Sequence, residues 1–200
     1  MASLLRKRVD LDLLQLANAL IVSHEALQSL SAAYCAEKKA WAFPMTGKDG
    51  KWCGVRLRNA EGFKWAVSGS SNGVFLPDTE PQPIAYLPEG PTDTAACLTL
   101  GLFAIGRPSC NTGVEELKSN LARLGIRKVV IISDNDNLKR IGNREGRPGI
   151  EGALRLKKEL RMLSVVWMPP GKIKDVREFL KRGGTRQLIE NEISKKPWTK

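Results

Sequence analysis

The first third of the chain combines a helical leucine pattern with several short alternating runs. Leucines recur at helical spacing through residues 10–22, which predicts a first helix. Ser23 is a suitable N-cap residue, and we expect a second helix from there to about Lys38. Short runs rich in aromatic and aliphatic residues follow, with an Asp49-Gly50 turn after the first of them. They predict a small antiparallel meander with strands at residues 40–46, 52–58, 63–68 and 74–76.

A proline-rich joint at residues 78–83 separates this pattern from a different one. Beyond it, short apolar runs alternate with amphipathic segments, which is typical of a parallel sheet covered by helices. The predicted strands are residues 84–87, 103–105, 128–133 and 164–168, and the predicted helices are residues 91–100, 113–124, 149–162 and 175–182.

The two patterns predict an α/β protein with a mostly parallel sheet flanked by helices, preceded by a small helical and antiparallel subdomain. We expect the N-terminal subdomain to cover residues 1–77 and the parallel-sheet domain residues 84–184. Residues 185–200 are expected to form a C-terminal helix and a mobile tail.

Acidic residues follow three of the predicted parallel strands. Glu89 follows the first strand, Asp134 and Asp136 follow a later one, and Asp175 comes after a short polar loop beyond the last. The carboxyl ends of parallel strands meet at one edge of a sheet, so we expect these carboxylates to converge. Carboxylate oxygens are the ligands that Mg²⁺ prefers, which predicts a divalent metal site. Asp93 is expected either to face Glu89 or to interact with the positive N-terminus of its helix.

The net charge of the chain is +11, and all of it lies in the second half. Residues 1–106 carry 10 Lys or Arg and 10 Asp or Glu, whereas residues 107–200 carry 22 and 11. A basic surface around a small acidic centre suits a polyanionic substrate that must also meet a metal ion. The charge therefore favours nucleic acid as a partner, and a basic surface that is merely solvated is the alternative.

The composition argues against zinc and against a membrane protein. The four cysteines form no Cys-x-x-Cys pair and His24 is the only histidine, so we expect no zinc. No apolar run reaches the length of a membrane span, and we expect no membrane partner. The N-terminus lacks the apolar core of a secretion signal, so a cytoplasmic protein is expected.

The acidic pattern resembles the Toprim domain of DnaG-type DNA primases, over about residues 84–182. That family carries a glutamate after the first strand, matched by Glu89-Gly90, and an Asp-x-Asp after a later strand, matched by Asp134-Asn135-Asp136. Lys174-Asp175 matches a further aspartate found in primases, and the helix start after Gly149 is similar as well. The resemblance implies that Glu89, Asp134 and Asp136 are catalytic. The implied metal ligands are Glu89, Asp93, Asp134, Asp136 and Asp175, with Mg²⁺ or Mn²⁺ as cofactor.

The meander resembles, more loosely, the small subdomain that precedes Toprim in these primases. There, an arginine and a lysine line the groove for template and nucleotide phosphates, and Arg58 and Lys64 take those positions here. The alternative is that both are exposed strand charges on a solvated face. Five aromatic side chains of the meander either pack its core or stack on single-stranded bases, namely Trp41, Phe43, Trp52, Phe63 and Trp65.

A basic loop follows the Asp-x-Asp at residues 137–147. We expect its cations to hold incoming triphosphates or the template backbone, although a solvated loop is equally compatible with the sequence; they are Lys139, Arg140, Arg144 and Arg147. Arg107, after the second parallel strand, is a weaker candidate for the same role.

These features predict a DNA primase catalytic core of bacterial, phage or mobile-element origin. It would join ribonucleoside triphosphates on a single-stranded DNA template. The chain has neither the zinc-binding module usual in this family nor a P-loop, so a separate zinc-binding subunit or a replicative helicase is an expected partner. A Toprim-type metal-dependent nuclease is the alternative enzyme. A DNA-binding or replisome-docking subunit with purely structural acids is the alternative without catalysis.

Overall fold

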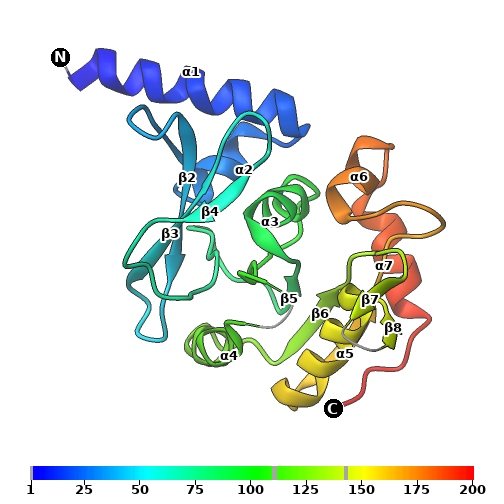
Figure 1. The fold of residues 1–200 in the computed structure, drawn as a ribbon. Coiled ribbons are helices and arrows are strands. Elements are labelled where there is room, and N and C mark those ends of the chain that lie inside the picture. The colour runs from blue at the N-terminus through cyan, green and yellow to red at the C-terminus, as the bar shows by residue number, and fades with distance from the viewer. Residues whose placement is uncertain (1, 110–111, 142–143) are drawn as a thin grey trace.

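The computed structural model describes residues 2–109, 112–141 and 144–200, with the backbone alone for residues 2–10, 139–141 and 144. It has an antiparallel sheet near the N-terminus and a parallel sheet farther along the chain, with helices around both (Figure 1). The α/β class predicted from the sequence is confirmed. No helix in the described ranges is both long enough and apolar enough to cross a membrane.

The N-terminal part begins with two helices, α1 (Ala2–Leu20) and α2 (His24–Ser29). Ser23 caps α2 as expected, because its Oγ accepts a hydrogen bond from the backbone N–H of Ala26 at 3.1 Å. The predicted continuation of this helix to Lys38 is wrong. The backbone of Ser31 adopts a positive φ of 53°, and the following residues form a strand, β1 (Ala33–Cys35), that pairs with the meander.

The meander forms a four-stranded antiparallel sheet in the order β1-β2-β3-β4. Its other strands are β2 (Ala40–Thr46), β3 (Trp52–Arg58) and β4 (Lys64–Ala66). Residues 74–76, predicted as a strand, make only single bridges, but these bridges join the two sheets. Val74 pairs with Thr46 of β2, and Phe75 pairs with Gly106 beside the parallel sheet.

The parallel sheet has the order β5-β6-β9, formed by β5 (Ile84–Leu87), β6 (Lys128–Ile132) and β9 (Leu163–Trp167). The predicted strand at residues 103–105 lies along the free edge of β5, where Tyr86 forms a parallel bridge with Ala104. The carboxyl ends of β5, β6 and β9 lie in register, since Leu87 pairs with Ile131 and Ile131 with Val166.

Helices cover both faces of this sheet, as a parallel sheet requires. One buried cluster joins Val130 of β6 to α1, α2, α3 (Gly90–Thr99), α6 (Val176–Lys181) and α7 (Arg186–Ser194). The other joins Ile131 to α4 (Val114–Arg123) and α5 (Pro148–Leu160). The strands therefore read as continuous apolar runs, because successive side chains enter opposite clusters.

Two segments differ from the sequence-based expectation. The predicted basic loop contains a two-stranded hairpin, formed by β7 (Lys139–Ile141) and β8 (Arg144–Gly146). The C-terminal tail, expected to be mobile, packs against β9: Thr199 pairs with Ser164, and the Lys196 ammonium donates to the carbonyl oxygen of Val166 at 2.9 Å. The predicted domain boundaries stay predictions.

Candidate active-site groove

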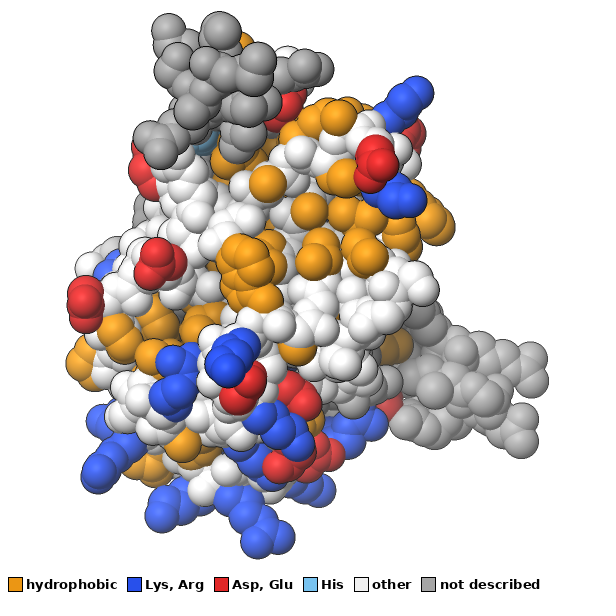
Figure 2. Space-filling model, turned by 90° about the vertical axis from the view of Figure 1, so that its left-hand side faces the viewer, with side chains coloured by type: hydrophobic (Ala, Val, Ile, Leu, Met, Phe, Trp, Pro, Cys, Tyr) orange, Lys and Arg blue, Asp and Glu red, His pale blue; other side chains and the backbone are white. Residues whose placement is uncertain are grey.

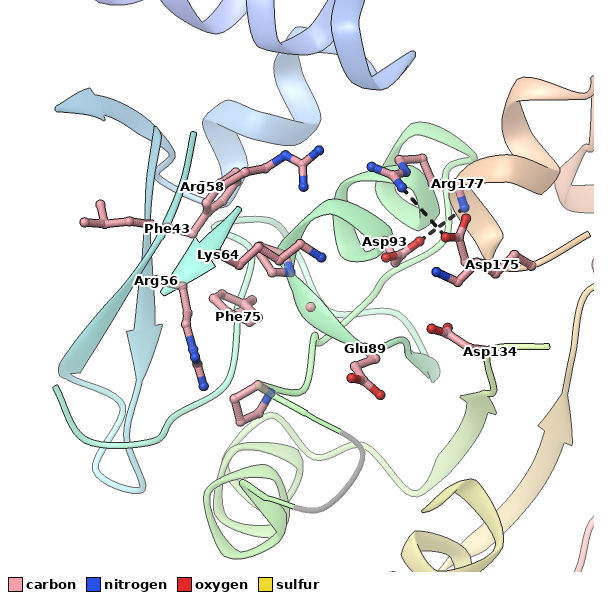
Figure 3. Close-up of a pocket in the computed structure, with 15 residues that line it drawn as sticks. Phe43, Arg56, Arg58, Lys64, Phe75, Glu89, Asp93, Asp134, Asp175 and Arg177 are labelled. Atoms are coloured by element: carbon pink, nitrogen blue, oxygen red, sulfur yellow. Dashed lines mark hydrogen bonds and ion pairs between the residues drawn. The ribbon is translucent and has the colours of Figure 1, made fainter. Parts of the chain in front are cut away.

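A groove lies between the two sheets and has a cavity volume of about 180 Å³. Its two walls differ in charge: the charged residues of one are all cations, and the other carries the acids together with Lys174 and Arg177 (Figure 3). The basic wall comes from β3 and β4 of the meander, and the acidic wall comes from the segments that follow β5, β6 and β9. The aromatic side chains of Phe43 and Phe75 also line the groove, on the side of the basic wall. The bridge between Phe75 and Gly106 keeps the two sheets adjacent, so the walls face each other.

Glu89 enters the groove from the turn between β5 and α3. It is the N-cap residue of α3, but its side chain makes no capping hydrogen bond. The turn depends on Gly90, which has a φ of 76° and donates its N–H to the carbonyl oxygen of Arg107 at 2.8 Å. The half-buried carboxylate of Glu89 is therefore left available inside the groove (Figure 3).

Asp93 lies in the first turn of α3 and has only 7% of its surface exposed. Its Oδ1 accepts a hydrogen bond from the backbone N–H of Arg177 at 3.3 Å, so it links α3 to α6. Burial, together with the negative charges of Asp175 and Asp134, raises the pKa of Asp93 to about 7. The structure is compatible with both expectations for Asp93, an interaction with the end of its helix and a place in the acidic site.

Asp134 follows β6 and points into the groove from the side opposite the basic wall (Figure 3). The backbone on either side is held: the N–H of Ser133 donates to the carbonyl oxygen of Trp167, and that of Asn135 to the carbonyl oxygen of Lys174 at 2.6 Å. Burial and the charges of Glu89, Asp175 and Asp136 raise the pKa of Asp134 to about 6.

Asp136 lies beside this groove, in an adjoining recess that Lys172 and Lys174 also line. It is half-buried and close enough to Asp134 to raise the pKa of that residue. The two members of the Asp-x-Asp therefore face neighbouring hollows.

Asp175 is the N-cap residue of α6 and is 7% exposed. Its Oδ1 accepts a hydrogen bond from the backbone N–H of Glu178 at 2.7 Å, and its Oδ2 lies 3.7 Å from a guanidinium nitrogen of Arg177. One oxygen of Asp175 is thus used to begin the helix, and the other lines the groove among charged neighbours.

Arg58 and Lys64 are directly opposite each other in the β3–β4 register. Both extend toward the acids across the groove (Figure 3). Although Lys64 as a whole is exposed, desolvation of its ammonium lowers the pKa of Lys64, and the charge of Asp93 opposes that shift. Desolvation and the nearby Arg177 likewise lower the pKa of Arg58. Each cation is therefore close enough to the acidic wall to respond to its charge.

The predicted phosphate contact of Arg107 is at odds with its position. Only 3% of Arg107 is exposed, and its guanidinium donates to the carbonyl oxygen of Ile132, the last residue of β6, at 3.1 Å. Its backbone pairs with Glu89 in a parallel bridge. Arg107 therefore ties the end of β5 to the end of β6 and sets the relative position of Glu89 and Asp134 from within the protein.

The basic loop has four cations that were predicted to bind phosphates, and the structure describes the side chain of one of them, Arg147. The side chains of Lys139, Arg140 and Arg144 lie outside the described residues. Arg147 is exposed at the start of α5, where its backbone N–H donates to the carboxylate of Glu151 at 3.2 Å. Their predicted role in binding triphosphates stays a prediction.

Three further cations line the groove and were not assigned a role from the sequence: Arg56, Lys174 and Arg177. A signal for Arg56 was present, because Arg56 and Arg58 are two residues apart on β3 and therefore lie on the same face of the strand. A signal for Arg177 was present, because a helix that begins at Asp175 places the second residue after it in the same first turn.

The acidic wall fits a divalent cation in its donor chemistry. Burial first, and then the charges of neighbouring carboxylates, raise the pKa values of Asp93 and Asp134, and a cation would relieve the repulsion between these carboxylates. Among the described residues, no three acidic, histidine or cysteine side chains converge closely enough to hold one ion together. Mg²⁺ binds proteins through carboxylate oxygens and keeps several waters, and its binding at these acids stays a prediction.

No family model and no curated protein matches the sequence of this chain. Several solved structures share its fold. The zinc-binding and RNA polymerase domains of the Aquifex aeolicus primase match with a TM-score of 0.69 at 13% identity, over 90% of this chain and 54% of that one. A DnaG primase catalytic domain bound to single-stranded DNA matches with a TM-score of 0.66 at 13% identity, over 90% and 72%.

The primase fragment of the bacteriophage T7 primase-helicase is similar as well. It matches with a TM-score of 0.62 at 14% identity, over 84% of this chain and 69% of that one. The chain therefore has the fold of the DnaG primase catalytic core, which confirms the fold resemblance inferred from its acidic motifs.

Proposed function

We propose that the protein is a metal-dependent nucleotidyltransferase of the DNA primase type, which synthesises short RNA primers on a single-stranded DNA template. The observation that carries this proposal is the groove with one acidic and one basic wall. The acidic wall suits metal ions and the reacting hydroxyl, and the basic wall suits phosphates. A reaction between a hydroxyl and a triphosphate on a polyanionic template needs both at once.

The basic wall would hold the phosphates of the template and of the incoming nucleotide. Arg58 and Lys64 project from neighbouring strands, so their charges act on the same stretch of the groove. Contacts of this kind position a strand without reading its sequence. A DnaG catalytic domain with the same fold was solved bound to single-stranded DNA, which is compatible with this assignment.

The acidic wall would organise the reacting groups. Five carboxylates would hold Mg²⁺ or Mn²⁺: those that line the groove, Glu89, Asp93, Asp134 and Asp175, and Asp136 in the adjoining recess. When bound, the metal supplies positive charge that neutralises phosphate oxygens. Glu89 is suited to accept the proton of the attacking 3′-hydroxyl, because its half-buried carboxylate caps no helix N–H.

The overall step forms one bond and breaks another. The oxygen of the 3′-hydroxyl forms a bond with the α-phosphorus of the nucleotide, and the bond from that phosphorus to the pyrophosphate oxygen breaks. Lys64 and Arg58 would stabilise the negative charge on the phosphates during this exchange, so catalysis rests on positioning and charge neutralisation.

The test is primer synthesis by the purified protein on a single-stranded template with nucleoside triphosphates and Mg²⁺ or Mn²⁺. Asp134→Asn removes one negative charge from the groove with little change in shape, and we expect a loss of about 100-fold or more in rate. Asp78→Asn is the matched control, because Asp78 is an exposed carboxylate in the joint between the sheets. Synthesis that survives Asp134→Asn would contradict the mechanism.

The same assay separates the alternative functions. Metal-dependent cleavage of DNA without nucleotide incorporation would favour a Toprim-type nuclease, which needs the acids but no groove for nucleotides. DNA binding without turnover, unchanged in Asp134→Asn, would favour a structural subunit. If synthesis needs an added factor, a replicative helicase or a separate zinc-binding subunit is the first candidate, since one structure of this fold belongs to a primase-helicase and another includes a zinc-binding domain.

A further inference from the structure

A second hollow opens on the far side of the acidic wall, between the end of α1 and the helix α6. We call it the α6 recess; it has a cavity volume of about 660 Å³. Lys174, Asp175 and Arg177 line both the groove and the α6 recess. The groove and the α6 recess are therefore adjacent, and a ligand that extends past these three residues would reach both.

Basic side chains outnumber acidic ones in the α6 recess. Lys174, Arg177, Lys181 and Arg182 line it, with only two carboxylates beside them. Both carboxylates already have partners. Glu178 accepts hydrogen bonds from the guanidinium of Arg182 at 2.6 and 3.0 Å and from the backbone N–H of Lys174 at 2.8 Å.

Asp175, the second carboxylate, caps α6 and lies near the guanidinium of Arg177. Within the described part of the chain, the ammonium groups of Lys174 and Lys181 have no hydrogen bond or ion pair. The charge of Lys174 acts on Asp134 and that of Lys181 on Glu178, but no direct contact from the described residues holds either ammonium, so both can reach an anionic ligand.

The opposite side of the α6 recess is apolar. It is formed by the last turn of α1 and the residue after it, with Ala19, Leu20 and Ile21. Ile21 is 46% exposed although it is a large hydrophobic residue. A wall of cations facing a wall of aliphatic side chains suits a chain in which phosphates alternate with sugars and bases, and suits a free triphosphate less well.

We propose that the α6 recess binds the backbone of the nucleic-acid strand that passes through the groove, and so extends the template-binding site beyond the acidic wall. This inference rests on the proposed function. The six residues of α6 span about 9 Å, since each helical residue rises 1.5 Å. That length is enough for more than one backbone phosphate of a single strand that follows the helix.

The test compares single-stranded DNA binding by the wild-type protein and by the double variant Lys181→Ala/Arg182→Ala. Neither residue lines the groove, and the Arg182–Glu178 ion pair lies at the surface, so the fold should tolerate the change. The matched control is Lys158→Ala/Lys195→Ala, which also removes two exposed positive charges and touches neither the groove nor the α6 recess.

Binding of fluorescent oligonucleotides of 4, 8 and 16 nucleotides is measured by anisotropy over a range of salt concentrations. For the 16-mer, we expect the α6 double variant to bind about 10-fold more weakly at low salt. The slope of log affinity against log salt should fall by about 1.4, because each lost phosphate contact on a single strand contributes about 0.7. The control should match the wild type, and binding of a fluorescent nucleoside triphosphate should not change.

Two results would overturn the inference: equal 16-mer affinities and salt slopes for the α6 and control variants, or a loss of triphosphate binding in place of oligonucleotide binding. The measurement needs no turnover. If the wild type makes no primer, the proposed function fails by itself, while the binding data still decide whether the α6 recess holds a strand.

Discussion

The two walls of the groove are built in different ways. The acidic wall is buried and held by backbone hydrogen bonds. Asp93 and Asp175 are each 7% exposed, and the residues on both sides of Asp134 donate backbone hydrogen bonds. The basic wall stands on the surface of the meander, where Lys64 is exposed and Arg58 half-buried. The first wall therefore resists movement, and the second can adjust to a ligand.

This difference also appears in the distribution of charge over the surface. Figure 2 shows Lys and Arg side chains gathered on the lower part of one face, at the height of α4 and of the β2–β3 turn in Figure 1. Surface cations of this kind attract a polyanion at long range. Some Asp and Glu side chains lie among these cations (Figure 2), whereas Asp93 and Asp175 of the acidic wall are buried. We expect changes in the acidic wall to alter stability and changes in the basic wall to alter binding.

The largest expected effect concerns the pH dependence of stability. The pKa of Asp93 is raised from 3.8 to about 7, so the folded protein binds a proton that the unfolded chain has released above pH 4. The free energy of unfolding should therefore fall as the pH rises from about 4 to 7, by at most about 4 kcal/mol. Asp93→Asn should flatten this fall. Denaturant unfolding in EDTA, between pH 4 and 8, measures it.

Glu61→Gln is the control for this experiment, because Glu61 is an exposed acid of the meander. A steep fall that persists unchanged in Asp93→Asn would show that the burial of Asp93 does not govern the pH dependence.

The next effect tests the backbone support of Asp134. A Cβ atom on Gly149 would collide with the carbonyl oxygen of Asp134, and a backbone atom cannot turn away as a side chain can. Gly149→Ala should lower the free energy of unfolding by about 1–3 kcal/mol, and primer synthesis should fall further because Asp134 is displaced. Chemical denaturation and the primer assay measure the two effects. Leu154→Ala, on the exposed side of α5, serves as control and should change stability by about 0.5 kcal/mol at most.

The smallest effect on stability is expected in the basic wall. Lys64→Gln should change the free energy of unfolding by about 0.5 kcal/mol at most, because Lys64 is exposed. It should weaken single-stranded DNA binding and reduce the salt slope by about 0.7. Lys38→Gln, in the exposed turn between β1 and β2, is the matched control. Equal DNA binding by the two variants would remove Lys64 from the proposed phosphate site, and a large loss of stability would contradict the contrast between the walls.

Much of this arrangement could be predicted from the sequence. The apolar runs before Glu89 and Asp134 are local patterns, and parallel strands in register bring their carboxyl ends together, so a convergence of acids was predictable. The departures have non-local causes. Residues 33–35 became a strand because β2 was available to pair with them, and the tail packed because β9 presented an open edge.

The burial of a charged residue could not be predicted in the same way. From the sequence, both Arg107 and Arg58 were predicted to contact phosphates. Only the packing of β5 against β6 gives the two arginines different environments. Arg107 is buried and donates a hydrogen bond to the carbonyl oxygen of Ile132, whereas Arg58 lines the groove. Arg177 gained its place because α6 packs against α3, which is a contact between segments 84 residues apart.

The sequence by itself determined the strand–helix order, the α/β class and the identity of the acids, because apolar periodicity and turn residues act over a few neighbouring positions. The tertiary structure alone decided which charges share one groove, which are buried, and that the acids meet a basic wall from a separate sheet. Those properties depend on how Phe75 and Gly106 join the sheets and on how α6 docks beside them, and no local pattern records such distant contacts.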